Sequence, residues 1–185
     1  INSRIDVIRS HQLIMLPASP LSYRENRIKH GLKCRYRVVP STVDLYKLFG
    51  EEFCAPEIDE ICVENKTLSF EDYIECRKFN LTVETFYNNG IFEDLIKLLK
   101  RHDIKISSFI LNIHEKVKNS EMFSGFLDNF VKETKELWES REELVEFLKD
   151  KEVQKKYNAT LMGNNEQLFY RTVGILDMIE ELHKV

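Results

Sequence analysis

Two arginines on one predicted strand have the spacing in this chain that most suggests chemistry. The segment CRYRVV, residues 34–39, alternates in the manner of a strand, which places Arg35 and Arg37 on the same face. Two guanidinium groups that point the same way could bind a carboxylate or a phosphate of a substrate. The plainer alternative is that both are exposed strand residues paired with nearby glutamates. The sequence leaves both interpretations open, with the plainer one the more common arrangement.

Other chemical motifs are missing from the sequence. It has no glycine-rich phosphate loop, no His-Glu-x-x-His and no histidine pair at helical spacing. The spacing of the cysteines matches no zinc, redox or cluster-ligand pattern, so we predict four reduced thiols, Cys34, Cys54, Cys62 and Cys76. We therefore predict no catalytic residue and no metal site on this chain.

Composition excludes some classes of partner. The chain has 185 residues, of which 43% are hydrophobic and 31% charged, and its net charge is −4. No face is predicted to be strongly basic, so we expect no nucleic-acid partner. No apolar run approaches the roughly 20 residues that span a bilayer, and the start lacks the apolar core of a signal peptide, so we expect no membrane association.

The first third of the chain mixes strand and helix signals. Residues 13–16, LIML, form a short apolar run typical of a strand covered on both faces, and Pro17 ends it. A short helix is predicted after Ser22, with Gly31 stopping it. Residues 57–64, EIDEICVE, are predicted to form a weaker, edge-like strand that could pair with residues 34–39.

The rest of the chain is predicted to be helical. Ser69 and Asp72 are typical of a helix start, Gly90 of a helix end, and Ser140 with Glu143 of a capping box. Short connections between amphipathic helices favour antiparallel neighbours. We therefore predict a mainly α protein, in which a helical bundle of residues 67–185 packs behind a small α/β segment of residues 1–66. The predicted later helices cover about 91–99, 104–118, 120–138, 143–150 and 166–184.

Three segments resemble one enzyme family. LIMLPASPLSYRENRIKHGLKCRYRVVP, residues 13–40, resembles the end of the barrel in cobalamin-binding radical S-adenosylmethionine (radical SAM) enzymes. In that family a strand ending in Leu-Pro-Gly-Thr/Ser is followed by a helix and a Thr-Arg-Tyr-Arg-type strand. Residues 57–99 and LWESREELVEF, residues 137–147, are similar to the family's C-terminal region.

The resemblance implies a C-terminal portion of such an enzyme. The family holds its iron–sulfur cluster with Cys-x3-Cys-x2-Cys near the start of the barrel, and this chain has no such motif. The implied role is to close the barrel, whose last parallel strand would be residues 13–16, and to shape the substrate entrance. The chain alone would be inactive and hold no cofactor. The parent would use an iron–sulfur cluster and S-adenosylmethionine in the cytoplasm, with cobalamin dependence left open, and its N-terminal remainder would be the partner.

The resemblance also implies site residues. Leu16, Pro17, Ala18 and Ser19 match the rim of the barrel near the adenosyl group, and are the implied cofactor-binding residues. Ala18 stands where the family often has glycine, which counts against a close approach of the backbone to a ligand. Arg35 and Arg37 match the Arg-Tyr-Arg strand and are the candidate substrate-binding residues.

Two alternatives remain. The chain could be a stand-alone helical module that binds a partner, in which case the strand at 13–16 must be covered by its own chain or by a second copy in a homodimer. It could also be a small enzyme, although no convergent set of polar residues supports that. Because the sequence begins at Ile1 and initiator Met is seldom removed before a large residue, we expect a piece of a longer protein.

Overall fold

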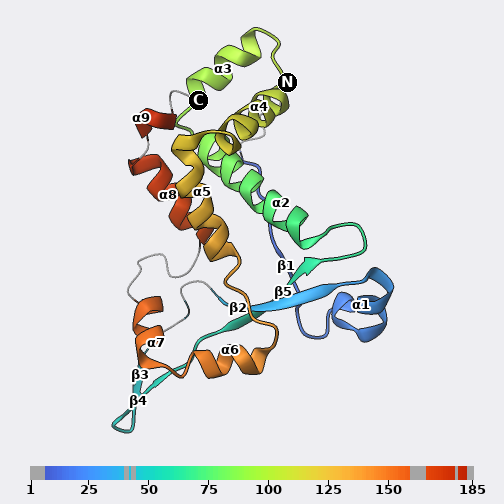
Figure 1. Ribbon diagram of the computed structural model, residues 1–185, viewed down its shortest axis with the longest axis vertical. Coiled ribbons are helices and arrows are strands. Elements are labelled where there is room, and N and C mark those ends of the chain that lie inside the picture. The colour runs from blue at the N-terminus through green and yellow to red at the C-terminus, as the bar shows by residue number, and fades with distance from the viewer. Residues whose placement is uncertain (1–6, 40–41, 43–44, 159–165, 178, 183–185) are drawn as a thin grey trace. The chain divides into compact units, whose positions relative to one another are not determined.

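The computed structural model describes residues 7–39, 42, 45–158, 166–177 and 179–182, and these are mainly helical with a few short strands (Figure 1). They divide into two compact units. The sheet unit contains residues 12–73 and 134–169, and the helical unit contains residues 7–11, 74–133 and 170–182. The division therefore differs from a single break at residue 66. Among the described residues no helix is long and apolar enough to span a bilayer.

The sheet unit is built on a three-stranded antiparallel sheet with strand order β1-β5-β2. Strand β2 (Lys33–Val38) pairs with β5 (Ile58–Glu64), which confirms the predicted pairing. The edge-like character predicted for residues 57–64 is wrong, because β5 is the central strand and Ile61 is fully buried. A central strand tolerates its charged residues here because arginines pair with them.

Strand β1 (Leu13–Ile14) differs from the prediction of a strand covered on both faces. It pairs antiparallel with β5 and lies at the edge of the sheet, where Leu13 is 42% and Ile14 38% exposed. Met15 alone in this run is buried. Among the described residues no strand pairs with the outer edge of β1. The barrel neighbours that the resemblance implies stay a prediction.

Helix α1 (Arg24–His30) follows a 3-10 turn, Pro20–Ser22, and ends where predicted. Gly31 has φ +63° and donates its N–H to the last carbonyls of the helix. A β-carbon at Gly31 would lie 2.9 Å from Cγ of Lys66, so both the backbone angle and the space favour glycine. This turn leads directly into β2, beside which α1 lies in Figure 1.

A β-hairpin interrupts the connection between β2 and β5, and the sequence analysis did not predict it. Its strands are β3 (Leu45–Leu48) and β4 (Glu51–Cys54). Phe49 and Gly50 both have positive φ, the geometry of a tight two-residue hairpin turn. Asparagine or aspartate at the first turn position would have predicted this turn. Phenylalanine at that position is unusual, so the hairpin could not be predicted from its turn residues.

A second layer of the sheet unit comes from residues after 134. Trp138 was predicted to end the fourth helix, but that helix stops at Thr134 and Trp138 exchanges two backbone hydrogen bonds of 2.9 Å with Tyr36. This pairing satisfies backbone groups on the outer edge of β2. Helix α6 (Arg141–Phe147) is capped by Ser140, whose Oγ accepts from the Glu143 N–H at 3.1 Å, which confirms one half of the predicted capping box. The Glu143 carboxylate accepts from the Glu139 N–H at 3.1 Å, one residue before the N-cap. Helix α7 (Lys151–Asn158) completes the layer.

The helical unit packs around one apolar core. Helix α2 (Phe70–Val83) starts at the predicted place, where Ser69 and Asp72 exchange hydrogen bonds, and continues into a π-helical turn, Glu84–Asn88. The remaining helices are α3 (Glu93–Arg101), α4 (Ile106–Lys118), α5 (Glu121–Thr134), α8 (Glu166–Asp177) and α9 (Ile179–Leu182). The core residues are Leu81, Phe86, Phe92, Ile113, Val117, Phe123, Leu127, Phe130, Tyr170 and Leu182.

A buried histidine is expected to make the stability of the helical unit depend on pH. His114 Nδ1 lies 2.9 Å from Thr82 Oγ1, and the ring packs edge-on against Phe79. Burial and the charge of Lys118 lower the pKa of His114, against the weaker opposing charges of Glu115 and Glu75. The folded chain therefore resists a proton that the unfolded chain takes up near pH 6.5.

We expect the titration of His114 to leave the free energy of unfolding unchanged above about pH 7. As the pH drops through 6.5, the free energy of unfolding should fall. Urea unfolding at pH 7.5 and pH 5.5 measures this. The variant His114→Gln keeps a polar group beside Thr82 and cannot titrate, so its stability should change less between the two pH values. Equal pH dependence in both proteins would contradict the assignment.

Candidate functional site

The turn after β1, residues 16–19, is held by its own polar groups. The Ser19 N–H donates to the Leu16 carbonyl at 3.1 Å, and both the N–H and the hydroxyl of Ser22 donate to the Ser19 carbonyl. The Tyr23 hydroxyl donates to the Ala18 carbonyl at 3.3 Å. The turn therefore has a defined shape, although Leu16 and Ala18 are exposed.

Ala18 adopts the backbone conformation that glycine favours. Its φ is +62°, in the left-handed region, where a β-carbon costs roughly 1–2 kcal/mol. The radical SAM resemblance places glycine at this position. The residue type thus departs from that pattern, whereas its left-handed φ is one that glycine adopts without strain.

Replacing this alanine tests the conformation directly. We expect Ala18→Gly to raise the free energy of unfolding by about 0.5–1 kcal/mol, because glycine removes the strain and only part of the gain is lost to the freer unfolded chain. The control is Ala55→Gly, an exposed alanine without positive φ, which should lose a few tenths of a kcal/mol. Urea denaturation of both variants provides the comparison. A loss of stability in Ala18→Gly would refute the left-handed turn.

An ion pair fastens this turn and α1 to the sheet. Arg27 Nε donates to the Ser22 carbonyl at 2.9 Å, and its two terminal nitrogens bond both carboxylate oxygens of Glu60, one at 2.8 Å. The hydrogen bonds from Arg27 lower the pKa of Glu60, and those to Glu60 raise the pKa of Arg27. Glu60 is therefore ionised at neutral pH and does not suit the role of a general acid.

The thiol beside this ion pair is not activated. Cys34 Sγ lies 3.9 Å from Arg27 Nη1, yet burial, followed by the charge of Glu60, raises the pKa of Cys34 to about 12. A thiol needs a lowered pKa to act as a nucleophile near pH 7. Burial likewise raises the pKa of Tyr36 on the same face. The cluster therefore positions the turn and does not offer a nucleophile.

The two candidate substrate-binding arginines have carboxylate partners within the chain. Arg35 Nη2 lies 2.8 Å from Glu139 Oε1, and Arg37 Nη2 lies 3.7 Å from Asp59 Oδ2. These contacts match the plainer alternative of intramolecular pairing. Arg37 Nε is buried and has no hydrogen-bond partner among the described residues.

The structure does not bring the two groups of predicted site residues together. Glu60 is the cross-strand partner of Tyr36, so the Arg27–Glu60 pair and the turn it holds belong to the face of β2 opposite to Arg35 and Arg37. Among the described residues no group of histidine, cysteine and carboxylate side chains could hold a metal ion. The turn and the arginines therefore do not form one site.

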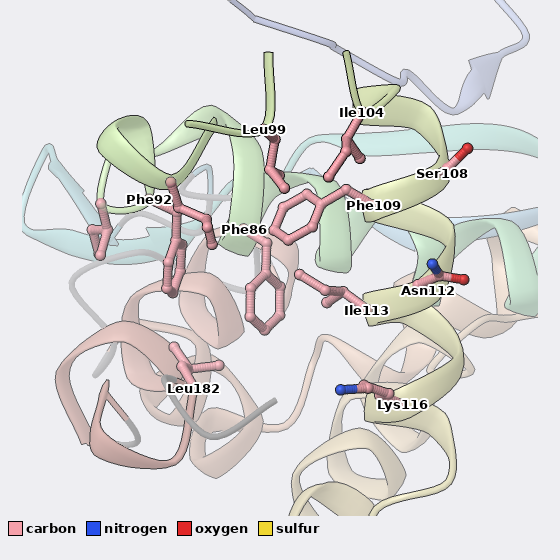
Figure 2. A pocket seen from close by; sticks show the side chains of 12 residues that line it. Phe86, Phe92, Leu99, Ile104, Ser108, Phe109, Asn112, Ile113, Lys116 and Leu182 are labelled. Atoms are coloured by element: carbon pink, nitrogen blue, oxygen red, sulfur yellow. The ribbon is translucent and has the colours of Figure 1, made fainter. Parts of the chain in front are cut away.

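A cavity lies within the helical unit, and the sequence analysis missed it. It has a volume of about 590 Å³, within the range of small-molecule sites. Figure 2 shows Phe86, Phe109 and Ile113 converging on it. The apolar stripe of residues 91–99 was the available signal, but a stripe that lines a cavity has the same spacing as one that fills a core. The lining residues are Phe86, Ile91, Phe92, Leu95, Leu99, Ile104, Ser108, Phe109, Asn112, Ile113, Lys116 and Leu182.

Comparison with known proteins assigns neither site to a family. The chain matches no protein-family model and none of the curated proteins.

Proposed function

We propose that this chain is the C-terminal portion of a radical SAM-type enzyme, in which it closes the barrel and helps to shape the substrate entrance. The iron–sulfur cluster and S-adenosylmethionine would be held by the N-terminal remainder, which carries the radical chemistry. The chain alone would be inactive. The proposal rests on the resemblance of residues 13–40, 57–99 and 137–147 to that family.

One structural observation carries the proposal, the exposed apolar edge at β1. Leu13, Ile14 and Leu16 are large apolar residues, and Leu16 is 60% exposed. The Met15 N–H donates to Glu60 of β5, so the N–H of the neighbouring Ile14 faces the outer edge. An apolar strand with an open edge is a liability that proteins usually cover. A neighbouring barrel strand from the parent would cover it.

The turn that follows β1 supports the same proposal. Its left-handed Ala18 has a backbone conformation that glycine adopts without strain, and Arg27 fixes the turn against β5. A turn at the end of a barrel strand, held in one shape, could present its backbone to the adenosyl group of the cofactor. Residues 16–19 would then act through backbone groups and not through reactive side chains.

The gene upstream of the codon for Ile1 tests the proposal first. We expect an in-frame reading frame there that encodes a Cys-x3-Cys-x2-Cys motif. An initiation codon directly before Ile1, preceded by an in-frame stop codon, would exclude the radical SAM assignment.

Association with the upstream segment is the second test. We expect the 185-residue chain, co-expressed with the segment encoded upstream, to copurify with it. The variant Ile14→Glu places a charge on the apolar edge and should reduce copurification at least tenfold. Leu176→Glu, at a residue that is 71% exposed in the helical unit, is the matched control and should copurify normally. Equal copurification of both variants would rule out β1 as the contact.

The second candidate function is a module that binds a partner protein. The observation that favours it is the β3–β4 hairpin, whose Tyr46 and Phe53 rings stack and remain exposed, while Phe49 at the turn is 96% exposed. Exposed aromatic side chains in one place are typical of contact surfaces. An initiation codon directly before Ile1, with an in-frame stop codon upstream, would favour this function. The mass of the chain in solution would then show whether it forms a dimer in which a second copy covers β1.

A further inference from the structure

We propose that the cavity of the helical unit binds a neutral, apolar small molecule. Three of its large apolar lining residues, Ile91, Leu95 and Ile104, remain 38–46% exposed, so the cavity presents apolar surface to water. The site is independent of the proposed function, because all of its lining residues belong to the helical unit and none belongs to the turn or to β1.

The wall of the cavity is mainly apolar and partly aromatic. Nine of its twelve lining residues are apolar. Three of these are phenylalanines from separate segments, namely Phe86 from the π-helical turn, Phe92 from the residue before α3 and Phe109 from α4. A bound apolar molecule would remove this concave surface from water, and the hydrophobic effect therefore favours its binding.

The π-helical turn beside the cavity is a second observation that points to a ligand. Residues Glu84–Asn88 form this turn, and π-helical turns are rare and occur frequently at functional sites. The turn supplies Phe86 to the cavity wall, where its ring stacks on Phe92 with centroids 5.3 Å apart. Figure 2 shows Phe86 facing Ile113 across the cavity. The irregular turn thus positions one aromatic wall of the site.

The polar part of the lining selects a neutral ligand. It consists of Ser108, Asn112 and Lys116, all on α4. Lys116 is the one charged residue among the described residues that line the cavity, and it is already engaged in an interaction within the chain. Figure 2 shows the Ser108 hydroxyl pointing away from the cavity. A charged ligand would lose its hydration here without gaining a partner of opposite charge, whereas a neutral ligand would not.

Two fluorescent probes with the same ring system test the site. The cavity volume of about 590 Å³ is within the range of small-molecule sites. N-phenylnaphthylamine is neutral, and anilinonaphthalene sulfonate adds a negative charge to the same rings. In fluorescence titrations of the 185-residue chain we expect saturable 1:1 binding of the neutral probe and about tenfold weaker binding of the sulfonate. Because the site belongs to the folded chain, the neutral probe should also move the urea midpoint to higher concentration.

A pair of variants locates the bound probe. Leu95→Glu places a carboxylate in the lining at a partly exposed position and should weaken the neutral probe roughly tenfold or more. Leu111→Glu is the matched control, because Leu111 is 54% exposed on α4 and lies outside the lining, and it should change binding less than about twofold. Far-UV circular dichroism verifies that each variant is folded. Ile104→Glu, at a lining residue between α3 and α4, replaces Leu95→Glu if that variant does not fold.

Four results would overturn the proposal. The first three are absence of saturable binding, equal effects of the lining variant and Leu111→Glu, and sulfonate binding as tight as that of the neutral probe. The fourth concerns a second copy of the chain as the occupant, which light scattering distinguishes. A dimer that the neutral probe converts into monomers would show that a second copy, and not a small molecule, fills the cavity.

Discussion

Phe130→Ala is expected to lower the free energy of unfolding of the helical unit by about 3–5 kcal/mol. Phe130 has no exposed surface and lies at the centre of the core on α5. Removing its ring leaves a cavity that the surrounding helices can fill only in part, so the loss includes both the transfer of the ring and the empty volume. We expect this to be the largest effect of a single truncation in the unit.

The neighbours of Phe130 add to the cost. The Tyr170 ring packs edge-on against it with centroids 5.6 Å apart, and the guanidinium of Arg77 lies 5.9 Å from its centroid. Both arrangements contribute beyond the buried area. Alanine would remove them together, leaving Arg77 and Tyr170 beside an empty space.

Urea denaturation followed by circular dichroism at 222 nm measures the loss in Phe130→Ala. Met122→Ala on the same helix is the control, because Met122 is 42% exposed and its truncation should cost about 0.5 kcal/mol or less. A loss below about 1.5 kcal/mol in Phe130→Ala would contradict its central place in the core.

Leu144→Ala is expected to destabilise the sheet unit by about 2–5 kcal/mol. Leu144 has no exposed surface and packs with Val38 of β2, Leu148 and Tyr157. Trp138 and Phe147 pack against this cluster, with ring centroids 4.9 Å apart. Truncation of Leu144 therefore weakens the contact between α6 and the sheet.

The single tryptophan of the chain reports on this change. Because Trp138 packs against the Leu144 cluster, we expect the midpoint of its fluorescence transition in urea to move to lower concentration in Leu144→Ala. Val145→Ala changes the adjacent residue of α6, which is 38% exposed. It should change the free energy of unfolding by about 0.5 kcal/mol or less and therefore leave the urea midpoint nearly unchanged. An unchanged Trp138 transition in Leu144→Ala would be inconsistent with the described core.

The sequence predicted the features that depend on residues close together in the chain. The helix starts at Ser69 and Ser140 and the end at Gly31 follow from side chains within three or four positions and from one backbone angle. The alternation indicated two strands and left their pairing possible, and the structure shows that β2 and β5 do pair. The β3–β4 hairpin was missed because Phe49, an aromatic residue, occupies the first position of its turn, where asparagine or aspartate would have indicated the turn.

For the candidate site, the sequence by itself indicated which arginines could bind a substrate. It did not indicate which of them form ion pairs with carboxylates of the same chain. The Glu139 partner of Arg35 comes from a segment predicted to follow a helix, and the Glu60 partner of Arg27 lies 33 residues away. No local rule encodes such pairs, because they depend on how sheet and helices stack.

The sequence thus determined the helical character of most of the later segments, the helix starts at Ser69 and Ser140, the helix end at Gly31, the alternating strands and the apolar character of residues 13–16. Tertiary structure alone decided that β1 is an edge strand of the described sheet, that Trp138 extends the edge of β2, and that the apolar stripe of residues 91–99 lines a cavity. The physical reason is that hydrogen bonding within a helix or turn is settled among near neighbours. Burial, pairing and empty space depend on the packing of segments distant in the chain.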